Sequence, residues 1–206
     1  KFVTLPKKEK KLPKYLTNED IRIVFDTPNL STPIGQRDRL ILELLYGTGI
    51  RVSELCDIKI DDIDSSKKII RVMGKGSKER IVCYGEICEE IMNVYLNDGR
   101  KVLLKDKPNK HLIVGTNKKD SKISTETIQK SINKIIKNAS IKKKVSPHVF
   151  RHTFATHLLN EGCDILIVKE LLGHSSLDTT GIYTHVSNEK LRRVYLENHP
   201  RAKKDL

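Results

Sequence analysis

A small set of basic, imidazole and phenol side chains along this chain could together act on a phosphodiester. In chain order they are Arg51, Lys75, His148, Arg151, His174 and Tyr183. Arginine is permanently charged and forks onto phosphate oxygens, whereas histidine can exchange a proton near neutral pH. A tyrosine phenol can serve as a nucleophile. These residue types are what an enzyme needs to attack a phosphodiester with a phenol.

The sequences around these residues form separate short motifs. They read T-G-I-R-V-S-E-L, G-K-G-S-K-E-R, P-H-V-F-R-H-T-F-A-T-H-L-L, L-L-G-H-S-S and T-G-I-Y-T-H. This array resembles the tyrosine recombinases, the integrase family of DNA breaking and rejoining enzymes, from about Leu12 to Ala202. Within that family it is most similar to the bacterial Xer site-specific recombinases, through L-L-Y-G-T-G-I-R-V-S-E-L, G-K-G-S-K-E-R and the terminal H-P-R-A.

The resemblance implies a DNA strand transferase that needs neither ATP nor a metal cofactor. Tyr183 would be the nucleophile, joining the 3′ phosphate and releasing a 5′ hydroxyl. A phenol with a pKa near ~10 leaves better than an alkoxide, so the phosphotyrosine link stays reversible. Arg51 and Arg151 would clamp the two non-bridging phosphate oxygens and follow the growth of charge in the transition state.

Proton transfer would fall to a lysine and a histidine. Lys75 resembles the hairpin lysine that protonates the leaving 5′ oxygen, and it stands directly between two glycines. Lys78 is the rival candidate. His148 would accept the tyrosine proton or bind phosphate, and His174 would hydrogen-bond the phosphate.

Glu54 is expected to orient a phosphate-binding residue without contacting the phosphate itself. It lies three residues after Arg51, so it could orient either Arg51 or His174. The remaining histidines are interpreted as structural or merely exposed: His152, His157, His185 and His199. Any one of the predicted site residues, taken alone, has an ordinary structural explanation; only the ordered set favours catalysis.

A metal site is the main competing explanation for the histidine-rich segment. His148 and His152 have helical i, i+4 spacing, but the text is H-V-F-R-H and not H-E-x-x-H. The arginine between the two would repel a cation. We therefore predict no metal and no other cofactor.

The composition favours a polyanionic partner. The chain of 206 residues has a formal net charge of +13 and 32% charged residues, and cations that neutralise DNA phosphates release condensed counterions. A lysine-rich surface would give the same balance without any such partner. No apolar run approaches the ~20 residues of a membrane span, and no signal peptide is visible. Four cysteines without a C-x-x-C pair indicate reduced packing residues of a cytoplasmic protein.

Hydrophobic periodicity and capping signals predict a mainly α domain with a small antiparallel sheet, an α+β class. Gly47 and Gly49 should end the helix before Arg51, and residues 98–110 should form a basic connection. The predicted helices cover residues 17–25, 37–46, a short segment from 51, 86–96, a segment around 128–136, 147–160, 164–173 and 188–197. The predicted strands cover residues 69–73, 80–84 and 111–114.

The sequence also suggests a domain order and partners. Residues 1–14 look like a basic linker from an N-terminal core-binding domain, and residues 15–206 like the catalytic domain. The resemblance implies double-stranded DNA as partner, a recombinase tetramer on DNA and a possible paralogous recombinase, but no membrane. The role could be chromosome dimer resolution or mobile-element integration. A type IB topoisomerase, an inactive DNA-binding module and a metal-dependent nuclease are the alternatives.

Overall fold

The computed structural model describes residues 15–74, 79–105, 107–116, 122–173 and 187–203. The helices are α1 (Asn18–Asp26), α2 (Pro33–Thr48), α3 (Val52–Asp57), α4 (Glu86–Asn97), α5 (Gly99–Leu104), α6 (Thr125–Asn138), α7 (Pro147–Asn160), α8 (Ile165–Leu171) and α9 (Asn188–Asn198), with a 3-10 turn η1 (Ile60–Asp62). The strands are β1 (Ile63–Asp64), β2 (Ile69–Met73) and β3 (Glu79–Cys83). Within these ranges no helix is both long and apolar enough to cross a bilayer.

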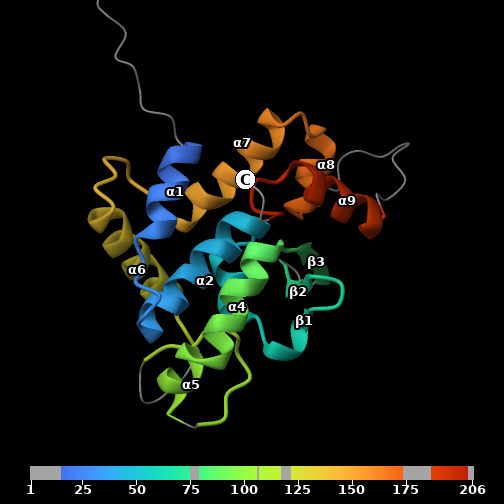
Figure 1. Ribbon diagram of the computed structural model, residues 1–206. Coiled ribbons are helices and arrows are strands. Elements are labelled where there is room, and N and C mark those ends of the chain that lie inside the picture. Colours follow the sequence, from blue (N-terminus) through green and yellow to red (C-terminus); the bar gives the residue numbers. More distant parts are fainter. Residues whose placement is uncertain (1–14, 75–78, 106, 117–121, 174–186, 204–206) are drawn as a thin grey trace, which may run out of the picture.

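Helix α2 forms the centre of the fold. Pro33 occupies a first-turn position and the Thr32 hydroxyl accepts a hydrogen bond from the Gly35 N–H at 3.1 Å, both of which favour a helix start. Every residue from Leu40 to Thr48 is buried. The helix packs against α3, α4, α5, α6 and α7, and Figure 1 shows it in the middle of the molecule. An apolar helix surrounded in this way provides the core on which the smaller elements are placed.

A three-stranded antiparallel sheet lies beside the helices, in the order β1-β2-β3. In β2, Ile70 and Val72 are buried whereas Arg71 and Met73 are exposed, which is the two-residue alternation of a strand with one buried face. Strands β2 and β3 pair up to Met73 opposite Glu79, so the residues between them connect the two strands. Strand β2 contacts α3, which attaches the hairpin to the helix that follows Arg51.

The predicted class, mainly α with a small antiparallel sheet, is confirmed, but several element boundaries were wrong. Helix α2 begins four positions earlier than expected, and Gly47 lies inside it. The predicted connection over residues 98–110 contains α5, and the two residues of β1 were missed. Residues 111–114 form only isolated bridges, from His111 to Lys59 and from Val114 to Lys122. Short elements such as these are set by tertiary contacts that periodicity does not report.

Gly49 ends α2 in a conformation that suits glycine. Its φ of 64° is left-handed, a common helix C-terminal geometry in which a side chain is disfavoured. A Cβ there would lie 2.6 Å from Cδ1 of Phe154 and 3.0 Å from Cδ2 of Leu172. The turn that leads to Arg51 is therefore closely covered by α7 and the end of α8.

Gly49→Ala is expected to lower the free energy of unfolding by about 2–4 kcal/mol, from left-handed strain and overpacking together. Gly162→Ala is the matched control, because Gly162 also has a positive φ of 86° but no atom within 4 Å of a built Cβ. That control should lose only about 1–2 kcal/mol. Urea unfolding measures both variants, and equal losses would contradict the close packing at Gly49.

The C-terminal segment packs against its own chain. Tyr195 of α9 is buried, and so are His199 and Ala202 after the helix. Arg201 donates from Nε to the fully buried Glu43 carboxylate of α2 at 3.1 Å, and a second bond comes from Nη2. Loss of α9 and the residues after it would remove core side chains, so a truncation there would affect stability as well as any contact with another subunit.

Candidate functional site

Arg51 lies at the junction between α2 and α3. After the left-handed turn at Gly49, Arg51 is extended, with φ −79° and ψ 150°, and occupies the N-cap position of α3. Its backbone N–H donates to Oε2 of Glu54 at 2.7 Å, and its Nη1 donates to Oε1 at 3.0 Å. About a third of the Arg51 side chain is exposed. One carboxylate therefore fixes both the start of α3 and the direction of the Arg51 guanidinium.

A second arginine binds the same carboxylate from the sheet. Arg80 of β3 donates from Nη1 to Oε1 of Glu54 at 2.6 Å and from Nη2 to Oε2 at 2.8 Å. Arg80 stands opposite Val72 in the β2–β3 pair, and directly opposed residues share a face of the sheet. The side chain of Glu54 is only 3% exposed, so this forked pair is largely shielded from water.

Arg151 joins the ends of two helices. It is buried in α7, where its Nη1 donates to the carbonyl oxygen of Gly49 and its Nη2 donates to that of Leu172 at 2.7 Å. Gly49 precedes Arg51 by two positions, and Leu172 precedes His174 by two. The backbone next to two predicted site residues is thus held by one guanidinium.

The charges of Arg51, Arg80 and Glu54 all act on Arg151, although only Arg51 and Arg80 bind the Glu54 carboxylate directly. Burial lowers the pKa of Arg151 to about 10, the charges of Arg51 and Arg80 act in the same direction, and Glu54 opposes them. Burial would raise the pKa of Glu54, but hydrogen bonds from Arg80 and Arg51 outweigh it and hold that pKa below its usual value. The cluster has positive charge in excess, so an anion bound beside it would be stabilised.

The other predicted site residues are not joined to this cluster by described contacts. His148 is exposed in the first turn of α7, one helical turn before Arg151, and no hydrogen bond or ion pair links it to the cluster in the described part of the chain. Lys75, His174 and Tyr183 lie outside the described residues. The rival Lys78 also lies there, as does His185.

The histidines interpreted as structural fit that interpretation where they are described. Nδ1 of His157 is 2.8 Å from the Tyr46 hydroxyl in the core, and burial is the first cause of the lowered pKa of His157. His199 is stacked on Tyr195 with ring centroids 5.1 Å apart, and burial is likewise the main reason that its pKa falls to about 3. Within this aromatic cluster both imidazoles are neutral packing groups near pH 7.

Sequence reasoning missed Arg80. It ends the motif G-K-G-S-K-E-R, which was used only for its lysines. The signal that could have found it is the strand alternation, because Arg80 lies two positions before the buried Val82 and so shares its face of the strand. An arginine on the buried face of a strand needs a carboxylate partner, and Glu54 is the partner that tertiary packing supplies.

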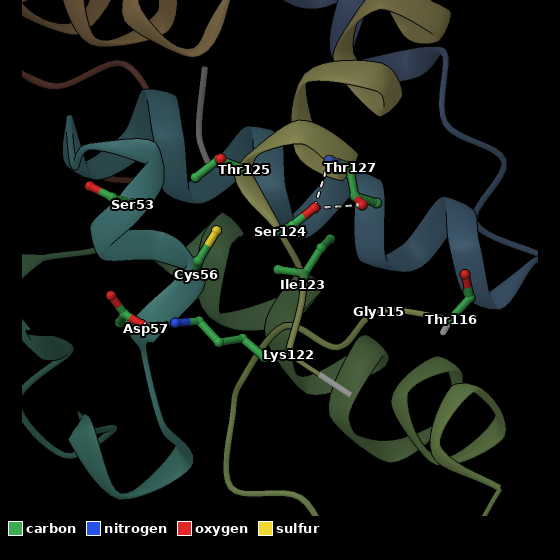
Figure 2. Close-up of a pocket in the computed structure, with 10 residues that line it drawn as sticks. All are labelled: Ser53, Cys56, Asp57, Gly115, Thr116, Lys122, Ile123, Ser124, Thr125 and Thr127. Carbon is green, nitrogen blue, oxygen red and sulfur yellow. Dashed lines mark hydrogen bonds and ion pairs between the residues drawn. The ribbon is translucent and has the colours of Figure 1, made fainter. Parts of the chain in front are cut away.

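A separate pocket opens on another side of α3. It has a volume of about 500 Å³. Figure 2 shows Cys56 and Asp57 of α3 turned toward the segment that leads into α6. Lys122 pairs with Asp57 there, and the Ser124 hydroxyl caps α6 by accepting from the Thr127 N–H at 3.1 Å. No predicted catalytic residue is among its described lining residues. The charge cluster, and not this pocket, is the candidate site.

A family model covers the part of the chain that carries this site. The model for the phage integrase family matches residues 14–190, a range that contains α1 to α8 and the whole arginine cluster. The chain belongs to the phage integrase family. Over the described residues of this family member, no group of three or more histidine, cysteine, aspartate or glutamate side chains could hold a metal ion.

Curated integrase-family relatives include the XerC proteins. Tyrosine recombinase XerC of Bacillus subtilis (strain 168) is 44% identical over 201 residues, covering 98% of this chain and 66% of the relative. XerC of Staphylococcus haemolyticus (strain JCSC1435) is 46% identical over 206 residues, covering 99% of this chain and 68% of the relative. The chain thus spans about two thirds of the length of these relatives.

Solved integrase-family structures share the fold. The crystal structure of XerA recombinase has a TM-score of 0.70 at 37% identity, covering 93% of this chain and 67% of that one. XerH site-specific recombinase, crystallised on its difH substrate in a pre-cleavage complex, has a TM-score of 0.68 at 27% identity, covering 90% of this chain and 50% of that one. The fold expected from the sequence, that of the tyrosine recombinases, is therefore confirmed.

Proposed function

We propose that this chain is the catalytic part of a site-specific recombinase that cleaves and rejoins duplex DNA through a 3′-phosphotyrosine intermediate. The observation that carries the proposal is a group of three arginines next to the junction of α2 and α3. Arg51 and Arg80 bind the Glu54 carboxylate, and Arg151 binds the carbonyl oxygen of Gly49, two residues before Arg51. A phosphodiester is an anion, and its negative charge grows as a nucleophile attacks, so excess positive charge favours the transition state. The similarity to the XerC tyrosine recombinases and to the XerH site-specific recombinase bound to its difH substrate supports recombination, with duplex DNA as the substrate.

The proposed first step transfers the phosphoryl group from DNA to the enzyme. The phenol oxygen of Tyr183 forms a bond to phosphorus, and the bond from phosphorus to the 5′ oxygen breaks. Arg51 and Arg151 hold the two non-bridging oxygens during this step. The 5′ hydroxyl of a partner strand then attacks the phosphotyrosine, which releases Tyr183 and rejoins the DNA. The number of phosphodiester bonds is conserved, so no energy source is required.

Proton transfer completes the cycle. Lys75 gives a proton to the leaving 5′ oxygen, and Lys78 remains the rival for this role. His148, exposed at the start of α7, accepts the tyrosine proton or binds phosphate, and His174 donates a hydrogen bond to the phosphate. Glu54 keeps Arg51 oriented. No metal or other cofactor enters this scheme.

The wider context of the reaction is also a proposal. Residues 1–14 act as a linker to an N-terminal core-binding domain, and residues 15–206 form the catalytic domain. Recombinase subunits assemble as a tetramer on DNA, with a paralogous recombinase as a candidate partner. The cellular role is chromosome dimer resolution or mobile-element integration, in the cytoplasm where the chromosome lies.

Helix α9 is the proposed link between subunits. In this chain its apolar face is buried at Leu191 and Tyr195, and the segment after it is held by the Arg201–Glu43 pair. On DNA, the same face would dock into a neighbouring subunit and make the activity of one nucleophile depend on its neighbour. The buried contacts within the chain are those that such an exchange would have to replace.

Covalent capture tests the proposed function. The purified chain is incubated at low salt, where phosphate contacts are strongest, with duplexes whose central sequence is randomised. We expect DNA–protein adducts that survive SDS, enrich one short sequence and form equally well with EDTA. Binding without any adduct would instead identify a non-catalytic DNA-binding module. Cleavage abolished by EDTA would identify a metal-dependent nuclease.

A further inference from the structure

Arg80 makes more side-chain hydrogen bonds to Glu54 than Arg51 does, and it is less exposed. Both terminal nitrogens of Arg80 bind both carboxylate oxygens, at 2.6 and 2.8 Å, and the Arg80 side chain is only 16% exposed. Arg51 reaches the same carboxylate with one side-chain bond, at 3.0 Å, and is 33% exposed. A forked arginine–carboxylate pair is the more directional of the two arrangements. Arg80 therefore supplies most of the charge that balances Glu54.

Because Arg80 supplies most of the hydrogen bonds to Glu54, the Arg51 guanidinium keeps N–H donors that it does not use to bind Glu54. A guanidinium has five N–H donors, and in the described part of the chain Arg51 uses one nitrogen, Nη1, for a side-chain bond. Without Arg80, the buried carboxylate of Glu54 would lose two of its hydrogen bonds and would need a new partner for its charge. The nearest cation is Arg51, which a forked pair with Glu54 would turn away from a phosphate.

Arg80 also contacts the end of α8. A Cβ built on Gly173 would lie 2.5 Å from Cδ, 2.6 Å from Nε and 3.1 Å from Cζ of Arg80, so the arginine lies directly against the Gly173 backbone. Gly173 has a φ of 65° and immediately precedes His174. One side chain from the β2–β3 hairpin thus contacts both the Glu54 carboxylate and the backbone that leads to a predicted phosphate ligand.

We propose that Arg80 is a positioning residue for DNA cleavage: it neutralises Glu54 and so leaves the Arg51 guanidinium available to the scissile phosphate. This inference rests on the proposed function. It gives the third guanidinium a different task from the other two, because Arg80 acts through a carboxylate and not on the DNA. A direct phosphate contact is the competing role, and the orientation of both Arg80 terminal nitrogens toward Glu54 argues against it.

The test compares Arg80→Gln with the double variant Arg80→Gln/Glu54→Gln. The probe is a nicked duplex carrying the sequence enriched by covalent capture, and the readout is the single-turnover rate of adduct formation. Arg80→Gln should slow this rate roughly 10- to 100-fold, while DNA affinity stays within about twofold. The double variant should recover part of that loss, by at least about threefold, because a neutral amide no longer competes for Arg51 as a carboxylate does.

Arg71→Gln is the matched control. Arg71 stands on the same hairpin, on the opposite face from Val72 and Arg80, and donates to the Asp61 carbonyl oxygen at 2.7 Å. The Arg71→Gln variant loses the same positive charge, and it should form adducts at the rate of the unchanged chain. Arg80→Lys, which leaves a cation beside Glu54 without the fork, should fall between the unchanged chain and Arg80→Gln. If Arg80→Gln does not fold, the adduct rate of Arg80→Lys is compared with that of the unchanged chain instead.

The outcomes separate this inference from the proposed function. If the unchanged chain forms no adduct, the proposed function itself fails. If the unchanged chain reacts and Arg80→Gln, or Arg80→Lys in its place, reacts equally fast, only the positioning role is wrong. If Arg80→Gln is slow and Glu54→Gln restores nothing, Arg80 acts directly on DNA or by packing alone, and neutralisation of Glu54 is overturned.

Discussion

Tyr183→Phe is expected to abolish covalent attachment to DNA and to leave DNA affinity within about twofold of the unchanged chain. The substitution removes one oxygen atom, which is the proposed nucleophile, and keeps the ring. No other group at the site could form the same phosphotyrosine link, so the loss should be complete and not partial. Adducts are measured after SDS treatment, and affinity is measured by titration of labelled duplex.

Tyr15→Phe is the control for this substitution. Tyr15 is half-buried, and its ring makes edge contacts with His152 and His157, so the same oxygen is removed from a residue with no proposed part in catalysis. The control should form adducts at the unchanged rate. A Tyr183→Phe variant that still yields an SDS-resistant adduct would move the nucleophile to another residue.

Arg151→Lys should lower the rate of adduct formation by about 100-fold or more and also reduce stability. A lysine keeps one positive charge but cannot reach two carbonyl oxygens with a planar fork. Gly49 and Leu172 would lose the charged donor that holds their carbonyls. The turn before Arg51 and the end of α8 would then be fixed less firmly, so both rate and stability should fall.

Arg100→Lys separates the two effects. Arg100 is another arginine that donates to backbone carbonyls, with Nη2 2.7 Å from the oxygens of Asn109 and His111, and it is not part of the charge cluster. Each lost hydrogen bond to a charged donor is worth about 1.5–3 kcal/mol, so Arg100→Lys should also lower the urea midpoint. Its adduct rate, measured where every variant is folded, should stay unchanged. An Arg151→Lys variant as active as Arg100→Lys would remove Arg151 from the catalytic site.

Local signals in the sequence predicted several elements because their causes lie within a few residues. The predicted helix from residue 17 begins with a capping box between the Thr17 and Asp20 side chains. The Asp164 carboxylate caps α8 by accepting from the Leu166 N–H at 2.6 Å. The hairpin followed from alternation, and β2 has the predicted bounds. Boundaries failed where packing decided them, as at Gly47, which continues α2 because the helix is enclosed by its neighbours.

The sequence by itself determined the residue types, their order and the helices that carry Glu54, His148 and Arg151. It therefore determined the kind of chemistry and the mainly helical class. Only the tertiary structure decided that Arg80 pairs with Glu54, 26 positions away, and that Arg151 binds the carbonyls of Gly49 and Leu172, 102 and 21 positions away. Such contacts depend on how α3, β3, α7 and α8 pack together, and no local propensity or spacing encodes that packing.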